Sequence, residues 1–548
     1  MQGVKIHLKD QLVYKWAKHP QLEFYLKGNV CHKNKLLSVL DLATMINQNL
    51  SSASLNNVLE NLTGHFAFVF YDDEKLLMVN DCVSSFPVFY FLENDLLQIR
   101  DRIQFDTKNE SYPGRQIDQF ISSCFTLNDD LLFSDFKRLP NGSILLFENK
   151  KLFLDTYLNK HKNIQAQTHS LPQLEKKYEE TLADVFGRIY EQNKNNQILI
   201  PLSGGLDSRL ILAKMIEAGH QNIKCFTYGQ ENSFEREIAE KICKKLGVDW
   251  QFISFDKQVF EKYFSAEYQA YSNYAFNGSS LPYEQDFLAL LAYKNRVGWE
   301  ENSIVLSGFG ADVLAGSWLP SDIAWSKIDL SINGLIEYIL QNKKFFLSES
   351  LELNKKELHK KIATYFKEIK INNKQDFLHA LNHWGFDHRV SKYQIGCMRA
   401  FEKLGLRWTL PFCDKKYFDF WMNEVALEQK RDKLFYKNFI DKEIFKPLDI
   451  DFYYQGILHQ KPNDGIITKL KNLTPKPIKA GIKAFIPRKK LDVNNFDLLC
   501  DMLWEKLDEN SRRRFKKDRY NLNVLEGKVF VGATFAVAKN SRKDHFNE

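Results

Sequence analysis

The stretch that decides the fold spans residues 198–208 and reads ILIPLSGGLDS. Its first half is apolar like a buried strand, and residues 209–219, RLILAKMIEAG, continue as an amphipathic helix that a glycine ends. Gly204 and Gly205 allow backbone N–H groups to approach a ligand closely, and the start of a helix carries partial positive charge. This strand–loop–helix pattern predicts a cradle for a pyrophosphate group.

The side chains of this loop have separate predicted roles. Ser203 and Ser208 add hydroxyl donors for phosphate oxygens, whereas the carboxylate of Asp207 would repel them unless a metal ion intervenes. We therefore interpret Asp207 as a ligand of Mg²⁺. The predicted phosphate-binding residues are Leu202, Ser203, Gly204, Gly205, Leu206, Asp207 and Ser208. An ordinary glycine turn between a strand and a helix is the alternative interpretation.

Strand-like and helix-like segments alternate after this loop. Residues 223–229 and 249–255 have the composition of strands, and residues 233–247 that of a helix, with Asn232 and Glu235 as its predicted capping box. Such βαβαβ succession predicts a parallel sheet with right-handed crossovers and a ligand site at the carboxyl ends of its strands. The predicted contacts to adenine, at the end of the second strand, are Thr227, Tyr228 and Gly229.

A second glycine turn follows the strand-like residues 303–306, SIVL, and reads SGFGAD over residues 307–312. If it lies beside the first turn, Asp312 faces Asp207 and the two carboxylates hold Mg²⁺ on the pyrophosphate. Ser307 and Gly308 then belong to the nucleotide site. A purely structural glycine turn is the alternative.

The chain before residue 160 has a different character. Short aromatic and β-branched runs at residues 65–72, 76–81, 86–92 and 143–149 are separated by turn residues and predict a mainly antiparallel sheet domain. We place domains at residues 1–160 and 175–450, joined by a polar linker, followed by a basic extension at residues 451–548 without a recognisable motif.

Composition excludes several classes of protein. The 548 residues are 44% hydrophobic and 26% charged, as in folded multidomain proteins, and a net charge of +7 gives no clear sign of nucleic-acid binding. Eight cysteines without paired spacing indicate a reducing compartment, and no leader or long apolar run is visible, so we expect a cytoplasmic protein without a membrane span. The basic clusters 488–490 and 512–514 are interpreted as solvated faces, with an anionic partner or membrane surface as the alternative.

Taken together, these motifs resemble a known family. SGGLDS resembles the signature of pyrophosphatase-loop ATP enzymes, which cleave ATP to AMP and pyrophosphate, and SGFGAD resembles the SGxGxDE segment of asparagine synthetases. Residues 405–414, GLRWTLPFCD, resemble that family's GLExRxPFLD, with Arg407 and Thr409 as departures, and Val313 replaces the glutamate after Asp312. Residues 430–437 resemble a stretch that supplies a lysine near the adenylate. Lys433 is the predicted catalytic lysine, with two alternatives, Lys430 and Lys437.

The front domain resembles a class II glutamine amidotransferase at residues 62–72, 80–81 and 86–90. That class hydrolyses glutamine with an N-terminal cysteine whose own α-amino group is the base. Residue 2 here is Gln2, and the first cysteine, Cys31, has no free α-amine. The resemblance therefore implies a degenerate αββα scaffold, as in β-lactam synthetases and lasso-peptide cyclases, followed by a parallel-sheet, adenine-nucleotide α-hydrolase-like synthetase domain.

What the resemblance implies about activity is an ATP- and Mg²⁺-dependent synthetase. It would adenylate the carboxylate of a small molecule, peptide or sugar and transfer the acyl group to an amine, with Glu284 or Glu267 as an acid/base. The amine would be free ammonia, ammonia from a separate glutaminase, or an amine on the substrate. Two alternative functions stay open: adenylation of a sugar polymer or RNA, and binding of a nucleotide or a partner by a catalytically weak protein. Assembly as a homo-oligomer is also left open.

Overall fold

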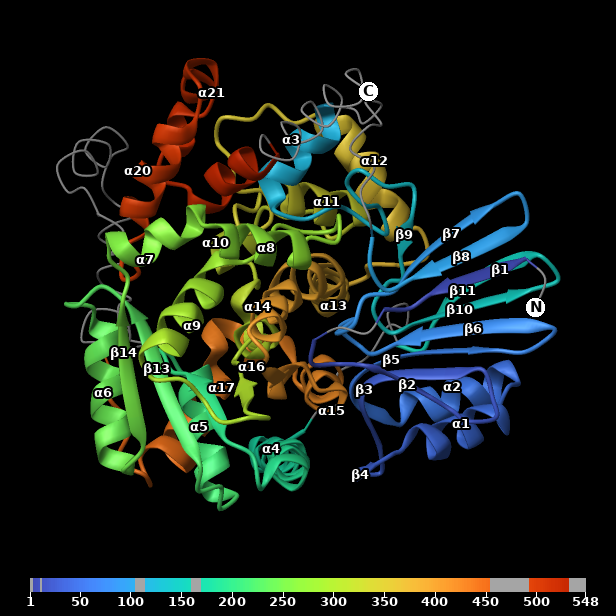
Figure 1. Cartoon of the computed structure of the whole chain (residues 1–548), viewed down its shortest axis with the longest axis horizontal. Helices are drawn as coiled ribbons and strands as arrows, with labels where there is room; N and C mark the ends of the chain where they lie inside the picture. Colours follow the sequence, from blue (N-terminus) through green and yellow to red (C-terminus); the bar gives the residue numbers. More distant parts are fainter. Residues whose placement is uncertain (1–2, 10–11, 104–113, 159–168, 454–491, 532–548) are drawn as a thin grey trace.

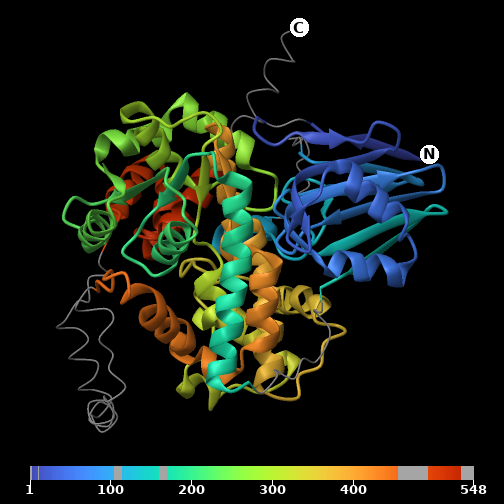
Figure 2. The same ribbon diagram turned by 90° about the horizontal axis from the view of Figure 1, so that it is seen from below.

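The computed structural model describes residues 3–9, 12–103, 114–158, 169–453 and 492–531. These residues form three β-sheets, two from the front of the chain and one from the part that follows (Figure 1). Seen from below, the front sheets form one lobe, and the rest of the chain forms a larger, helix-rich lobe beside it (Figure 2). The predicted fold class, α/β with a parallel-sheet domain following a front domain, is confirmed.

The front lobe is mainly antiparallel, as predicted. A four-stranded sheet has the order β1-β8-β7-β9, with β1 and β8 parallel, and a seven-stranded sheet has the order β11-β10-β6-β5-β3-β2, with β4 paired to β3. Six consecutive residues of β5 are buried, which indicates that both faces of this strand are covered. The elements are β1 (Val4–His7), β2 (Trp16–Lys18), β3 (Phe24–His32), β4 (Lys35–Leu36), α1 (Val39–Asn47), α2 (Ser52–Glu60), β5 (Leu62–Tyr71), β6 (Lys75–Asn80), β7 (Phe89–Glu93), β8 (Leu96–Arg100), α3 (Gly114–Ser123), β9 (Lys137–Arg138), β10 (Ser143–Glu148) and β11 (Lys151–Thr156).

The sheet of the larger lobe has five strands, all parallel, in the order β14-β13-β12-β15-β16. Its strands are β12 (Ile198–Pro201), β13 (Ile223–Gly229), β14 (Asp249–Ser254), β15 (Ile304–Leu306) and β16 (Arg407–Thr409). The strand order reverses between β12 and β15. Ligands of open parallel sheets bind at the carboxyl ends of the strands where the order reverses, and both glycine turns of this chain follow the two strands concerned.

Helices surround this sheet and fill the space between the lobes (Figure 1). The main ones are α4 (Leu171–Asn193), α5 (Asp207–Glu217), α6 (Phe234–Leu246), α8 (Ala266–Ala275), α9 (Glu284–Arg296), α11 (Ile332–Gln341), α12 (Lys355–Tyr365), α13 (Lys374–Gly385), α14 (Met398–Lys403) and α17 (Leu434–Ile440). The predicted capping box of α6 is wrong by one residue. Ser233, not Asn232, caps this helix, and its hydroxyl accepts from the Arg236 N–H at 3.3 Å.

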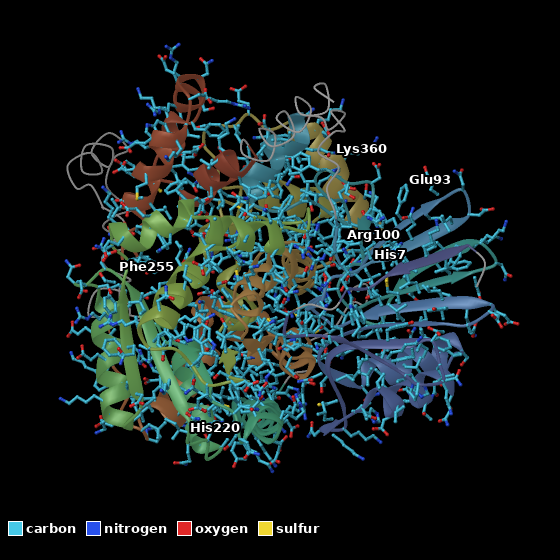
Figure 3. All side chains as sticks on the ribbon, viewed as in Figure 1. His7, Glu93, Arg100, His220, Phe255 and Lys360 are labelled. Carbon is cyan, nitrogen blue, oxygen red and sulfur yellow. The ribbon has the colours of Figure 1, made fainter. Side chains whose placement is uncertain are left out.

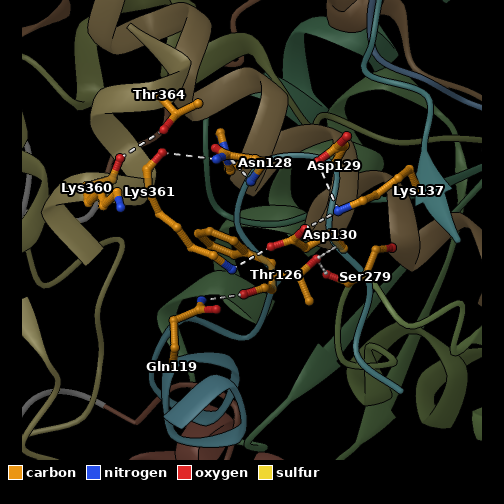
Figure 4. Close-up of polar contacts among 12 residues, drawn as sticks. Gln119, Thr126, Asn128, Asp129, Asp130, Lys137, Ser279, Lys360, Lys361 and Thr364 are labelled. Carbon is orange, nitrogen blue, oxygen red and sulfur yellow. Dashed lines mark hydrogen bonds and ion pairs between the residues drawn. The ribbon is translucent and has the colours of Figure 1, made fainter. Parts of the chain in front are cut away.

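A polar cluster joins the two lobes (Figure 4). The carboxylate of Asp130 accepts from Lys137 Nζ at 2.6 Å and from Lys361 Nζ of α12 at 2.5 Å. The side-chain amide of Asn128 donates to the Lys361 carbonyl at 3.0 Å. Because each charge has an opposite charge beside it, the cluster holds the lobes in register without leaving a buried ion unpaired.

The C-terminal extension is folded where it is described. Helices α20 (Phe496–Lys506) and α21 (Glu509–Arg514) precede residues that bond to the larger lobe, including Asp518, which accepts from Ser348 Oγ at 2.6 Å. Arg513 and Arg514 of the predicted basic face pair with Glu509 and Asp118, and residues 488–490 lie outside the described ranges. None of the helices in the described ranges is long and apolar enough to cross a membrane.

Candidate active site

The loop after β12 is held by its own hydroxyl groups. The Ser203 N–H donates to Ser208 Oγ and the Gly205 N–H donates to Ser203 Oγ, both at 3.1 Å. At the N-cap position of α5, the side chain of Leu206 makes no capping hydrogen bond. The start of this helix therefore keeps N–H donors and a partial positive charge for an anion, as the cradle prediction requires.

The Arg209 side chain stabilises this loop through hydrogen bonds to backbone carbonyls. This side chain is fully buried, and its guanidinium donates to the Gly204 carbonyl at 3.0 Å and to the Ile450 carbonyl at 2.9 Å. It also lies over the rings of Phe445 and Tyr453. One cation therefore fixes the first glycine turn to a segment about 240 residues further along the chain.

Replacing Arg209 with Met should destabilise the protein by about 3 kcal/mol or more, because two carbonyl oxygens lose charged donors inside the protein. Chemical denaturation would show the loss as a lower midpoint, and ATP binding should weaken with it. Arg236→Met is the matched control, since that arginine is about a third exposed and pairs with Glu231. An unchanged midpoint in Arg209→Met would contradict a bracing role.

The two glycine turns lie against each other. A Cβ atom on Gly308 would be 3.0 Å from Asp207 Cβ and 3.3 Å from the Ser208 nitrogen, so a side chain here would press on the first turn. Asp312, at the end of the second turn, lies 3.4 Å from Lys433 Nζ. Asp207, Asp312 and Lys433 thus gather at the point where the sheet order reverses, and Ser307, at the start of the second turn, is buried.

The electrostatics of this cluster suit a cation. Burial, and secondly the charge of Asp312, raise the pKa of Asp207 to about 7, while Tyr436 and Lys433 partly offset this increase. In the described ranges, no group of three or more His, Cys, Asp or Glu side chains is arranged to hold a metal ion. Two carboxylates are nevertheless the usual protein share of a Mg²⁺ site whose other ligands are water and phosphate oxygens, so this donor set fits that ion.

Sequence reasoning missed three side chains near this cluster. The Tyr436 hydroxyl donates to Asp207 Oδ1 at 2.6 Å. The charge of Asp312 acts on Lys344, which places a further cation near this carboxylate, and the charge of Arg389 acts on Lys344 in turn. Tyr436 could have been suspected because it lies only three positions after Lys433, in the first turn of α17. Nothing in the sequence marks Lys344 or Arg389.

Of the three candidate lysines, Lys433 is the one that lies beside the carboxylate of Asp312. Asp432 and Lys433 have φ values of +52° and +57°, a left-handed backbone that side chains of this kind rarely adopt and that is concentrated at functional sites. Lys430 is buried, with its pKa lowered to about 7 by burial, and Lys437 is partly buried. The geometry favours Lys433 among the three.

The predicted adenine contacts already have partners within the protein. The Thr227 hydroxyl donates to the Leu202 carbonyl at 2.6 Å, and the Tyr228 hydroxyl donates to Asp286 Oδ1 at 3.0 Å. The Gly229 carbonyl accepts from the Phe255 N–H at 2.8 Å. These residues lie at the expected strand end, but their hydrogen-bonding groups mainly fix β13 to its neighbours.

Neither predicted acid/base glutamate lies in the cluster. Glu267 is exposed in the first turn of α8, and Glu284, at the start of α9, is fully buried. The carboxyl of Glu284 instead meets that of Glu526 from the C-terminal extension, which is 4% exposed. Two carboxyls this close inside a protein cannot both be ionised, so at least one of them holds a proton.

This pair makes stability depend on pH. Burial raises the pKa of both carboxyls above their ordinary value of 4.5, so the folded protein holds a proton that the unfolded chain releases. Stability should therefore fall as the pH rises from about 4.5. We expect the double variant Glu284→Gln/Glu526→Gln to lose this dependence and to gain about 1–3 kcal/mol relative to wild type near pH 8. Thermal unfolding of both proteins from pH 5 to 8 measures the pH dependence and the gain in stability.

The exposed Glu505 provides the control, because Glu505→Gln should leave the pH profile of the wild type intact. Parallel profiles for wild type and the double variant would show that the carboxyl pair is not the titrating group.

The front lobe contains no activated thiol in its described part. Cys31 lies one residue before the end of β3, 2% exposed, where it accepts from the Gln192 side chain at 3.2 Å. Burial raises its pKa, which opposes thiolate formation. Gln2 lies outside the described residues.

The sheet order and its two glycine turns have the arrangement expected of an adenine-nucleotide α-hydrolase-like domain. Residues 193–445 match the family model described as asparagine synthase. The match covers most of the larger lobe and a little under half of the chain, and this part of the chain is similar to asparagine synthases.

A curated relative is the microcin J25-processing protein McjC of Escherichia coli, 25% identical over 244 residues, which are 43% of this chain and 43% of that protein. The chain thus spans less than half the length of this relative. Among solved structures, the NH3-dependent NAD synthetase of Campylobacter jejuni is 14% identical over 27% of this chain and 60% of that chain, with a TM-score of 0.19. The NMN synthetase of Francisella tularensis is 14% identical over 41% and 96%, with a TM-score of 0.21. TM-scores this low do not establish a shared fold.

Proposed function

We propose that this protein is an ATP-dependent, amide-forming synthetase that activates a carboxylate as its acyl-adenylate, releases pyrophosphate, and transfers the acyl group to an amine with release of AMP. One observation carries the proposal. Asp207, Asp312 and Lys433 come together from three segments of the chain, beside two glycine turns at the reversal point of the sheet.

Each residue has a role that its position supports. The loop from Ser203 to Ser208 and the start of α5 bind the pyrophosphate part of ATP through N–H and hydroxyl donors. Asp207 and Asp312 would hold Mg²⁺, which neutralises phosphate charge as the bond between the α- and β-phosphates breaks. Lys433, partly exposed, stabilises negative charge on the α-phosphate and on the tetrahedral species that forms when the amine attacks.

We further propose that the front lobe acts as a scaffold and supplies no ammonia of its own. The buried position of Cys31 within β3 supports this proposal. The amine would then be free ammonia, ammonia from a separate glutaminase, or an amine of the substrate itself. A carboxylate on a small molecule, peptide or sugar is the proposed acyl donor.

Pyrophosphate and AMP release from Mg-ATP, measured over a panel of carboxylates, tests this function. Hydroxylamine serves as the amine, because acyl-adenylates convert it to hydroxamates that are easily detected. Carboxylate-dependent release of both products with hydroxamate formation is expected. ATP binding without AMP release across the panel would instead favour a nucleotide-binding protein without synthetase activity.

A further inference from the structure

A cavity of about 1030 Å³ lies between the two lobes, and its lining includes no residue of either glycine turn. The front lobe contributes residues at the ends of β1 and β8, among them His7 and Arg100, which Figure 3 shows next to each other on the side facing the larger lobe. The opposite wall comes from residues 263–282 around α8, and the C-terminal extension supplies a third wall with Lys506 and Glu526.

Positive charge dominates this lining. The cations are Lys9, Arg100, Arg102 and Lys506, and the structure gives none of them an ion pair with a described carboxylate. Arg102 donates to the Asn273 carbonyl at 3.2 Å, and the Lys506 ammonium lies 5.3 Å from the centre of the Phe264 ring. Such cations retain their capacity to bind an anion.

Among the described residues of the lining, Glu526 is the acidic one, and it is buried. Its Oε1 atom is buried and has no hydrogen-bond partner among the described residues, although the carboxyl touches that of Glu284. A buried acceptor without a donor is uncommon in a folded protein and indicates that another molecule supplies the donor. The buried rings of Tyr263, Tyr268 and Phe276 also line the cavity.

We propose that this cavity binds a small organic anion, with a phosphate or carboxylate group at the Arg100, Arg102 and Lys506 side and hydroxyl groups that donate to Glu526. A volume of this size accommodates an ordinary small-molecule ligand. The site is separate from the nucleotide site and goes beyond the proposed function, since neither ATP nor its phosphates are needed to fill it.

Three sugars that differ in one group test the proposal on the full chain. Glucose 6-phosphate carries a phosphate group, glucuronate carries a carboxylate group, and glucose carries neither. Ligand-observed NMR titration should detect binding of at least one anion and weaker binding of glucose. The double variant Arg100→Gln/Arg102→Gln should bind that anion at least about tenfold more weakly, because charged hydrogen bonds are lost.

Two controls locate the binding. Lys355→Gln/Lys360→Gln removes two exposed cations of α12 outside the cavity and should change nothing. Asp207→Asn alters the nucleotide site and should also leave anion binding unchanged, so failure of the synthetase proposal would not affect this test. If the double arginine variant misfolds by circular dichroism, the exposed Lys506→Gln replaces it, with at least about a threefold loss expected.

Preference for glucose 6-phosphate identifies a phosphate ester, and preference for glucuronate identifies a carboxylic acid. The proposal fails if neither anion binds, if glucose binds equally well, or if the α12 control loses as much affinity as the cavity variant.

Discussion

Replacing Asp207 with Asn is expected to lower carboxylate-dependent pyrophosphate release by about 10²–10³-fold, the usual effect of removing one electrostatic contact to a transition state. Asn retains the size of the side chain and can still accept from the Tyr436 hydroxyl, so the fold should persist. What is lost is the negative charge that, together with Asp312, would hold Mg²⁺ on the phosphates. Release is measured with the carboxylate that gives the highest wild-type rate.

Glu217→Gln is the matched control, because Glu217 lies on the same helix, is largely exposed and pairs with Lys214. Its activity should equal that of the wild type. Raising the Mg²⁺ concentration should recover part of the activity of Asp207→Asn if the lost interaction is with the metal. Wild-type activity in Asp207→Asn would remove Asp207, and with it the paired-carboxylate site, from the mechanism.

Replacing Lys433 with Met is expected to reduce hydroxamate formation by about 10²-fold while ATP binding is retained. A cation that acts mainly on charge developing in the transition state changes kcat more than substrate affinity. Lys433→Arg should restore part of the rate, since it keeps the charge at the site. Quantification of hydroxamate by mass spectrometry, alongside AMP release, separates the amide-forming step from adenylation.

Two neighbouring changes make this prediction specific. Lys442→Met removes an exposed lysine nearby in the sequence, paired with Glu443, and should have no effect. Lys430→Met addresses the alternative lysine. If it abolishes hydroxamate formation while Lys433→Met does not, Lys430 is the catalytic lysine and the geometric preference for Lys433 is wrong.

The sequence was sufficient to predict those strands, turns and helices that are determined by residues close together in the chain. The ILIPLSGGLDS stretch predicted a strand, a turn and a helix, and β12 and α5 begin and end where the apolar period and Gly219 indicate. Alternation within each front strand predicted an antiparallel sheet domain, since side chains of a strand point to alternate faces. Boundaries were less certain because neighbouring polar residues compete as caps. Ser233 caps α6 in place of Asn232.

Only the tertiary structure decided which distant groups meet. It placed Gly308 against Asp207, Lys433 beside Asp312, and Tyr436 on Asp207, contacts that join segments 100 or more residues apart. It also took Glu284 out of the candidate active site and paired it with Glu526 from an extension that carries no recognisable motif. The physical reason is the same in each case. A motif determines the shape of its own backbone, whereas the neighbours of its side chains follow from how strands order in a sheet and how distant segments pack around it.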